Sequence, residues 1–209
     1  MADEATIAID NPAAELFLKA GFTEEYRTDE IIMLKKELIS RRIIVIGSPG
    51  SGKSTFARKL RDKTGLPLYY LDMIFHKPDR TTVSREEFDH SLSEILKTDQ
   101  WIIDGNYQRT LPLRFEECTE ACLFDIPVEQ CLAGAASRVG QIREDMPWIE
   151  KEFDSEFRQY ILDFQKDQMP GINKLIEQYK HIKKITVFHS SEEADNWLNG
   201  FTPIEYEGK

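Results

Sequence analysis

Short apolar runs alternate with stretches of helical spacing along the chain after residue 40. The runs predicted to be strands are 42–47, 68–71, 100–104, 121–126 and 184–188. The predicted helices are 53–63, 85–97, 108–118, 128–139, a long region from 147 to about 179, and 192–198. Several strands lack strict alternation of apolar and polar residues, as is typical of strands covered on both faces. This order predicts an α/β protein with a doubly wound parallel sheet.

The segment between the first predicted strand and the first predicted helix has the glycine pattern of a phosphate-binding P-loop. Its residues are Gly47, Ser48, Pro49, Gly50, Ser51, Gly52, Lys53, Ser54 and Thr55. Glycines let backbone amides approach phosphate oxygens, and the following helix directs its free N–H groups at the same anion. Lys53 can reach the terminal phosphates, and the Ser54 hydroxyl can bind Mg²⁺. The segment predicts binding of ATP or GTP with Mg²⁺; the alternative is a glycine-rich turn that binds nothing.

Aspartates follow three other predicted strands, at the sheet edge where ligands of parallel sheets bind. Asp104 follows an apolar strand, so it is the expected second Mg²⁺ ligand, with a helix N-cap as the alternative. Asp72 is expected to bind a substrate hydroxyl or to help place Mg²⁺, and helix capping explains it nearly as well. For Asp125 the sequence favours a helix start, because Pro127 follows it at a first-turn position.

Phosphoryl transfer needs cations around the moving group, and a basic segment downstream can supply them. Residues 138–147 contain Arg138 and Arg143 and interrupt a helical pattern with Gly140 and Pro147. A short, basic, interrupted segment of this kind is typical of a mobile lid that closes over ATP and excludes water. The alternative is an ordinary connection between helices with solvated arginines.

Composition narrows the class of protein. A chain of 209 residues with 41% hydrophobic residues can form one sizeable domain and a small appendage. A net charge of −10 argues against a general nucleic-acid surface, which needs clustered Lys and Arg. No window reaches the about 18 apolar residues of a membrane helix, and the acidic start is unlike a signal peptide. Three cysteines without metal-ligand spacing predict reduced thiols and a cytoplasmic protein.

Taken in order, these motifs resemble an adenylate-kinase-related family whose members are often labelled DNA topology modulation proteins. The resemblance rests on residues 43–60, Asp72, 101–107, 124–127 and 143–146, and it covers roughly 41–198. It implies a P-loop NTPase fold with a five-stranded parallel sheet in the order 2-3-1-4-5, flanked by helices, and a small lid. It also implies transfer of the γ-phosphate of ATP to a small acceptor.

The resemblance also implies roles for single residues. Asp104 and Arg109 resemble the ends of an Asp-Gly-x-x-Arg element whose arginine holds the acceptor phosphate, with one additional residue between them here. Arg138 matches an arginine at the lid entrance that contacts donor phosphates, and Arg143 matches an arginine of the lid. The position four residues before Arg138 usually carries an arginine that packs on adenine, and here it is Gly134.

The first forty residues resemble another family. Residues 10–22, Tyr26 and 31–36 are similar to the C-terminal end of a GNAT acetyltransferase, which is a helix followed by two strands. The part of that family that grips coenzyme A lies upstream of this segment, so no acetyltransferase activity is expected. A helix with two strands has unpaired edges and little core. We expect residues 1–39 to dock on the kinase-like domain, 40–209, or on a partner chain, as in a homodimer.

These expectations combine into an ATP-dependent kinase of a small molecule. The expected catalytic residues are Lys53, Asp104, Arg138 and Arg143. Asp72 and Arg109 are expected to face the acceptor, for which a nucleoside monophosphate is the first candidate. A sugar or shikimate-like hydroxyl compound is the runner-up, with Asp72 as the binding group or base. The alternative of a different class is a regulatory protein that binds nucleotide without catalysis. No contact with nucleic acid or membrane is expected.

Overall fold

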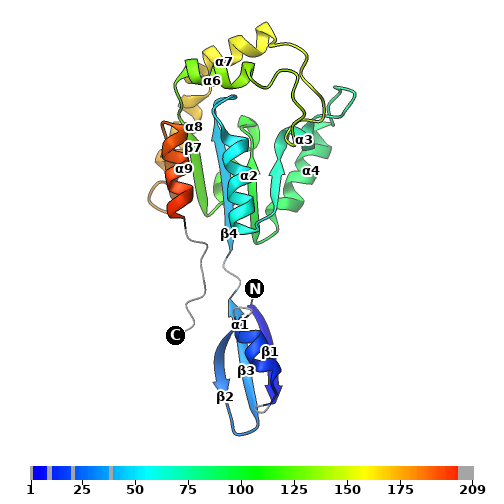
Figure 1. Ribbon diagram of the computed structural model, residues 1–209, viewed down its shortest axis with the longest axis vertical. Coiled ribbons are helices and arrows are strands. Elements are labelled where there is room, and N and C mark those ends of the chain that lie inside the picture. The colour runs from blue at the N-terminus through cyan, green and yellow to red at the C-terminus, as the bar shows by residue number, and fades with distance from the viewer. Residues whose placement is uncertain (1, 9–10, 20–21, 38–39, 202–209) are drawn as a thin grey trace. The chain divides into compact units, whose positions relative to one another are not determined.

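The computed structural model describes residues 2–8, 11–19, 22–37 and 40–201 of the chain. The described residues divide into two compact units, a smaller one that ends at Ser40 and a larger one over Arg41–Phe201 (Figure 1). In the described residues, no helix combines the length and the apolar character needed to cross a bilayer.

The larger unit is built on a five-stranded parallel sheet. Its strands are β4 (Arg41–Gly47), β5 (Leu68–Tyr70), β6 (Gln100–Asp104), β7 (Glu120–Phe124) and β8 (Lys184–Phe188). They pair in the order β5-β6-β4-β7-β8. Counted within this unit, that order is 2-3-1-4-5, as the resemblance implies. The central strand β4 carries an unbroken β-branched run because helices cover both of its faces.

Helices pack on both faces of this sheet (Figure 1). They are α2 (Lys53–Thr64), α3 (Leu71–Phe75), α4 (Arg85–Leu96), α5 (Leu111–Glu117), α6 (Val128–Ala136), α7 (Ser155–Asp167), α8 (Met169–Tyr179) and α9 (Ser191–Gly200). Ile43 and Val45 point into an apolar cluster with residues of α2 and α9. Ile44 and Ile46 point into a second cluster with residues of α4, α5 and α8. The pleat of β4 therefore connects two cores.

The predicted helical stretches differ from the observed ones in three places. The predicted helix 108–118 is a short 3₁₀ turn (Gln108–Thr110) followed by α5, and Pro112 lies in the first turn of α5. The long region after 147 begins with irregular chain and then divides into α7 and α8, with Pro170 in the first turn of α8. Helix α3 follows β5 directly and was not expected. Proline cannot donate a helix hydrogen bond, which explains both divisions.

Helix capping is an alternative for three aspartates, and none of them caps a helix: Asp104 ends β6, and the N-cap of the 3₁₀ turn that follows is Tyr107. The N-cap of α6 is Pro127, and Asp125 instead accepts a hydrogen bond from Gln165 Nε2 at 2.7 Å. The N-cap of α3 is Tyr70, which leaves Asp72 inside the first turn with its carboxylate available to other partners. The prediction that Asp125 helps to start a helix is therefore wrong.

The smaller unit is a three-stranded antiparallel sheet with one helix. Its elements are β1 (Ala2–Ala8), α1 (Ala13–Lys19), β2 (Thr23–Arg27) and β3 (Ile31–Glu37), and the strand order is β1-β3-β2. Ile7, Ile32 and Leu34 form its core. The expectation of one helix and two strands missed β1. This strand holds only one large apolar residue, Ile7, and it is defined by pairing with β3 along its whole length.

Candidate active site

The P-loop connects β4 to α2 below helices α6 and α7 (Figure 1). Gly47, Gly50 and Gly52 all have positive φ angles of 134°, 80° and 95°, which residues with a Cβ rarely adopt. A Cβ on Gly50 would also lie 1.9 Å from the backbone oxygen of Cys131. Gly52 is the N-cap of α2, and it has no side chain to occupy the free N–H groups of the first turn. These groups are available to an anion.

Lys53 provides the cation of this loop. Its side chain is buried, and Nζ donates a hydrogen bond to the Ser48 carbonyl oxygen at 2.7 Å. Burial lowers the pKa of the ammonium, whereas the nearby Asp104 carboxylate raises it. The loop carbonyl therefore holds the ammonium at the cavity that Lys53 lines, where a phosphate oxygen would replace or join this partner.

Asp104 ends β6 beside Lys53 and is 5% exposed. Among the described residues, its Oδ1 atom is buried without a hydrogen-bond partner. Burial raises the pKa of this carboxyl to about 6, although Lys53 and the Ser54 hydroxyl favour the ionised form. A buried carboxylate oxygen without a partner needs an explanation, and a bound cation supplies one. Carboxylate and hydroxyl oxygens are suitable Mg²⁺ ligands, so Asp104 and Ser54 fit the predicted metal.

A second carboxylate, Asp145, reaches the same hydroxyl and was missed in the sequence. It accepts hydrogen bonds from Arg143 Nη2 at 2.6 Å and from Arg143 Nε at 3.1 Å. Burial by itself would raise the pKa of Asp145, but Arg143 outweighs it and, with help from Ser54, lowers the pKa to about 2. The described residues contain no group of three or more His, Cys, Asp or Glu side chains placed to hold a metal. A Mg²⁺ ion here would take its other ligands from phosphates and water.

The two predicted lid arginines have different partners. Arg143 is bound to Asp145 and also donates to Glu150 Oε2 at 3.0 Å, so most of its charge is already balanced. In the described part of the chain, the Arg138 guanidinium has no hydrogen-bond partner, although it lines the cavity. Burial and the charge of Arg143 lower the pKa of Arg138. Of the two, Arg138 is therefore the arginine available to an anion, whereas Arg143 ties Asp145 and Glu150 together.

Two cavities meet at the P-loop. The larger, of about 520 Å³, is called the acceptor cavity, and the smaller, of about 250 Å³, is called the loop cavity. The loop cavity is lined by Gly50, Gly52, Ser54, Thr55, Arg58, Gly134, Ser137, Arg138, Gln141, Arg143 and Asp145. The acceptor cavity is lined by Pro49, Lys53, Ser54, Asp72, His76, Asp104, Gly105, Asn106, Tyr107, Gln108, Arg138, Arg143, Asp145, Met146, Trp148, Glu150, Phe157, Tyr160 and Gln168. They share Ser54, Arg138, Arg143 and Asp145, so a phosphate chain at these residues can extend into both.

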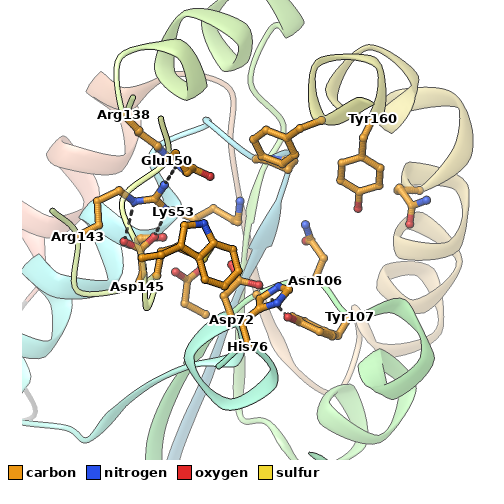
Figure 2. A pocket seen from close by; sticks show the side chains of 18 of the residues that line it. Lys53, Asp72, His76, Asn106, Tyr107, Arg138, Arg143, Asp145, Glu150 and Tyr160 are labelled. Atoms are coloured by element: carbon orange, nitrogen blue, oxygen red, sulfur yellow. Dashed lines mark hydrogen bonds and ion pairs between the residues drawn. The ribbon is translucent and has the colours of Figure 1, made fainter. Parts of the chain in front are cut away.

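Asp72 lies in the acceptor cavity, held by Tyr107 (Figure 2). The Tyr107 hydroxyl donates a hydrogen bond to Asp72 Oδ1 at 2.9 Å. The Tyr107 ring stacks on Phe88 at 5.0 Å between centroids and meets the edge of Phe75 at 5.4 Å. Burial and the Asp72 charge raise the pKa of Tyr107, so the phenol remains a donor. The second carboxylate oxygen of Asp72 is left for a ligand.

The loop after β6 is tied to the P-loop and to the core. Asn106 Oδ1 accepts from the Gly47 amide at 3.0 Å, and Asn106 Nδ2 donates to the Gly47 oxygen at 2.8 Å. Arg114 is fully buried and donates to the backbone oxygens of Gly105, Asn106 and Tyr107. Burial lowers the pKa of Arg114 to about 9. Arg114 thus positions the loop. The sequence prediction missed this residue, whose only sequence signal is that a single arginine lies on an apolar face of a helix.

Two residues of the adenylate-kinase-like pattern are placed differently from the expectation. Arg109 forms a bidentate pair with Asp89, at 2.9 and 2.5 Å, and lines neither cavity, which corrects its predicted contact with the acceptor. The additional residue before it places Gln108 toward the cavity and Arg109 outward. At the position of the expected adenine-packing arginine, a Cβ on Gly134 would lie 2.1 Å from the Gly50 carbonyl oxygen. Helix α6 thus packs on the P-loop too closely for any side chain there.

Comparison with known proteins gives distant structural matches. No protein-family model matches the chain, and no curated protein matches its sequence. A sugar kinase from Janibacter sp. HTCC2649 is 17% identical and superimposes with a TM-score of 0.47, over 77% of this chain and 91% of that one. Shikimate kinases from Aquifex aeolicus vf5 and Bacteroides thetaiotaomicron are 17% and 16% identical, each with a TM-score of 0.45 over 76% of this chain and 92% and 94% of theirs. At these values the matches carry no argument about the reaction.

Proposed function

We propose that this protein is a phosphotransferase that moves the γ-phosphate of a nucleoside triphosphate, with ATP the first candidate, to a hydroxyl group of a small acceptor. The observation that carries the proposal is the junction of two cavities at one cluster of phosphate-binding groups. The loop cavity presents the P-loop glycines, and the acceptor cavity presents Asp72. A donor and an acceptor can therefore meet at Lys53 and Ser54.

Each group at the junction has a task in this reaction. The P-loop amides and Lys53 bind the terminal phosphates, and Arg138 balances charge that develops on the transferred group. Ser54 and Asp104 hold Mg²⁺, and Asp145 lies close to the same hydroxyl. A Mg²⁺ ion at this site would neutralise phosphate charge and orient the triphosphate. Because Arg143 is tied to Asp145 and Glu150, closure of segment 138–150 would bring a braced lid over the site.

Asp72 is the group that receives the acceptor hydroxyl. Its Oδ1 atom is bound by Tyr107, so its other oxygen can accept the hydroxyl hydrogen bond and orient the attacking oxygen. Phosphoryl transfer depends mainly on positioning and on charge stabilisation, and less on a strong base. The carboxylate thus acts first by fixing the acceptor oxygen, and it takes the proton as the new bond forms.

The proposal is tested by separating nucleotide binding from transfer. Isothermal titration calorimetry with MgATP and MgGTP should show binding that Lys53→Met weakens at least about tenfold. A coupled assay for ADP should show faster ATP consumption when a suitable hydroxyl compound is added. Asp72→Asn should keep nucleotide affinity and lose this acceptor-dependent increase. Nucleotide binding with no acceptor-dependent turnover across a broad metabolite panel would instead favour a regulatory nucleotide-binding protein.

A further inference from the structure

The Lys and Arg side chains that line the acceptor cavity are the ones proposed to bind the triphosphate or to hold the segment around it. Among the described residues that line it, Lys and Arg side chains occur only at Lys53, Arg138 and Arg143. Lys53 belongs to the P-loop, and Arg143 is already neutralised by Asp145 and Glu150. Arg138 also lines the loop cavity and is needed by the donor. Among the described lining residues, no further Lys or Arg is left for a charged group on the acceptor, and His76, whose buried Nδ1 has no hydrogen-bond partner, is the one remaining side chain there that can become a cation.

The end of the cavity lined by Tyr107 and Tyr160 carries negative charge at Asp72. Burial and the Asp72 charge raise the pKa of both tyrosines, and Asp72 also lies within electrostatic range of Lys53 and Arg143. Arg109 cannot compensate this charge, because it is paired with Asp89 and faces away from the cavity. Arg114 is not available either, because its buried guanidinium donates hydrogen bonds to three backbone oxygens. An acceptor phosphate or carboxylate would therefore lie close to the Asp72 charge without a Lys or Arg side chain of its own, which is unfavourable in a partly desolvated site.

The walls of this end are aromatic. Tyr107, Trp148, Phe157 and Tyr160 line it, and Trp148 meets His76 edge to face at 5.1 Å between ring centroids. Figure 2 shows Arg138, Arg143 and Glu150 on one side of the cavity and Tyr107 and Tyr160 on the other. Aromatic faces bind flat rings by stacking and by apolar contact, and the hydroxyls of Tyr107 and Tyr160 leave polar contacts at the rim.

We infer that the acceptor is an uncharged compound with a flat ring and a free hydroxyl group, the class to which nucleosides belong, and that it carries no phosphate or carboxylate. This inference rests on the proposed phosphotransferase function and names the substrate class of the same site. The ring lies among Tyr107, Trp148 and Tyr160, and the hydroxyl lies at Asp72. It departs from the nucleoside monophosphate that the family resemblance implies.

The transfer step exchanges one phosphorus–oxygen bond for another. The acceptor oxygen forms a bond to the γ-phosphorus while the bond from this phosphorus to the bridging β–γ oxygen breaks. The bridging oxygen keeps the electron pair and leaves as part of the nucleoside diphosphate. The hydroxyl proton passes to the free oxygen of Asp72 and from there to solvent. The products are the phosphorylated acceptor and the diphosphate, and no further reactant is needed.

Matched pairs of ligands test the inference on the full chain. The pairs are adenosine and AMP, guanosine and GMP, thymidine and TMP, and uridine and UMP, each added with saturating MgATP. Product formation is followed by ion-exchange chromatography, and binding is followed by calorimetry with a non-hydrolysable ATP analogue. At least one uncharged member should bind and react at least about tenfold better than its monophosphate. Equal or better use of the monophosphates, or no binding of any uncharged member beside the analogue, overturns the inference.

Substitutions of Tyr160 test whether the aromatic wall of the cavity binds the ring of the acceptor. Tyr160→Ala should raise the KM of the uncharged acceptor at least about fivefold with little change in kcat, and Tyr160→Phe should restore most of this loss. Ile182→Ala is the control, because Ile182 is 71% exposed and lines neither cavity. An unchanged KM in Tyr160→Ala overturns the placement of the ring. Binding of the uncharged member beside the ATP analogue without any product formation would refute the phosphotransferase and leave the acceptor class supported.

Discussion

Asp104→Asn should make the ligand-free protein more stable and remove most of the stabilisation that MgATP provides. The ordinary pKa of this carboxyl is 3.8, and burial raises it to about 6 in the folded protein. An acid whose pKa is raised on folding stabilises the fold below its unfolded pKa, and this contribution is lost as the pH rises through the folded pKa. Around neutral pH the buried charge therefore opposes folding, and Asn removes that charge.

The size of this effect follows from the two pKa values. Their difference is about 2 units, and each unit corresponds to about 1.4 kcal/mol, so the charge costs up to about 3 kcal/mol at neutral pH. The folded pKa already includes the attraction of Lys53, so the loss of that attraction needs no separate correction. For a protein of this length, about 3 kcal/mol corresponds to a rise in Tm of roughly 6–12 °C.

Urea unfolding followed by tryptophan fluorescence measures this effect in the relevant part of the chain. All three tryptophans, Trp101, Trp148 and Trp197, lie in the larger unit, so the signal does not report on the smaller one. The free energy of unfolding of the unsubstituted protein should fall between about pH 4 and about pH 6.5, and that of Asp104→Asn should not follow this fall. Added MgATP should raise stability in the unsubstituted protein much more than in the variant.

Asp145→Asn is the matched control, because this second buried carboxylate has the opposite shift. Arg143 holds the pKa of Asp145 at about 2, so its charge stabilises the fold above about pH 4 and this contribution is lost as the pH falls toward 2. Removing it should cost about 2 kcal/mol at neutral pH. The reasoning is refuted if Asp104→Asn is less stable than the unsubstituted protein without nucleotide at neutral pH, or if both variants shift in the same direction.

Three further substitutions test other parts of the site. Lys53→Met should weaken MgATP binding at least about tenfold in calorimetry, because it removes the only buried ammonium among the described P-loop residues. Gly134→Ala should lower the free energy of unfolding by about 1–3 kcal/mol in urea and weaken nucleotide binding, since its Cβ would meet the Gly50 oxygen at 2.1 Å. Arg109→Ala should leave the acceptor KM and the Tm unchanged, because its pair with Asp89 is exposed and lies outside both cavities.

Each of these variants has an outcome that would contradict the structure. Unchanged nucleotide affinity in Lys53→Met would show that the loop does not bind triphosphate. A fully stable Gly134→Ala protein with normal affinity would show that α6 does not pack on the loop as described. A large rise in acceptor KM in Arg109→Ala would restore the contact that the family resemblance implies for this residue.

The parts of the fold that the sequence predicts well have local signals. The spacing of Gly47, Gly50 and Gly52 between a β-branched strand and a helix defines the loop, because positive φ and close approach leave glycine as the residue that fits. The five strands of the larger unit are short apolar runs in the predicted order along the chain. Their order in the sheet is not a local property, and it follows here from the family resemblance.

The rest of the site depends on where individual side chains point in the folded protein, and the sequence pattern does not contain this information. Gln108 and Arg109 are neighbours in one 3₁₀ turn, and the fold directs the first into the cavity and the second toward Asp89. A one-residue difference in a short turn decides between them. Asp145 reads in sequence as one acidic residue in a polar loop, and only tertiary packing brings it to Ser54. Arg114 is similar, because its partners are backbone oxygens that have no sequence signature.

The two departures from the adenylate-kinase-like pattern have a common consequence. The family pattern uses one arginine on the nucleotide base and another on the acceptor phosphate. Here the first position is closed by the contact of Gly134 with the Gly50 oxygen, and the second cation is removed from the cavity by Asp89. The groups proposed to bind the triphosphate are all present, because Ser54 and Arg138 line both cavities and Lys53 lines the larger one. The proposed phosphate chemistry therefore uses neither of these arginines, and the proposed recognition of the acceptor rests on aromatic contacts and on Asp72, whereas the loop cavity still offers Arg58 to the nucleotide.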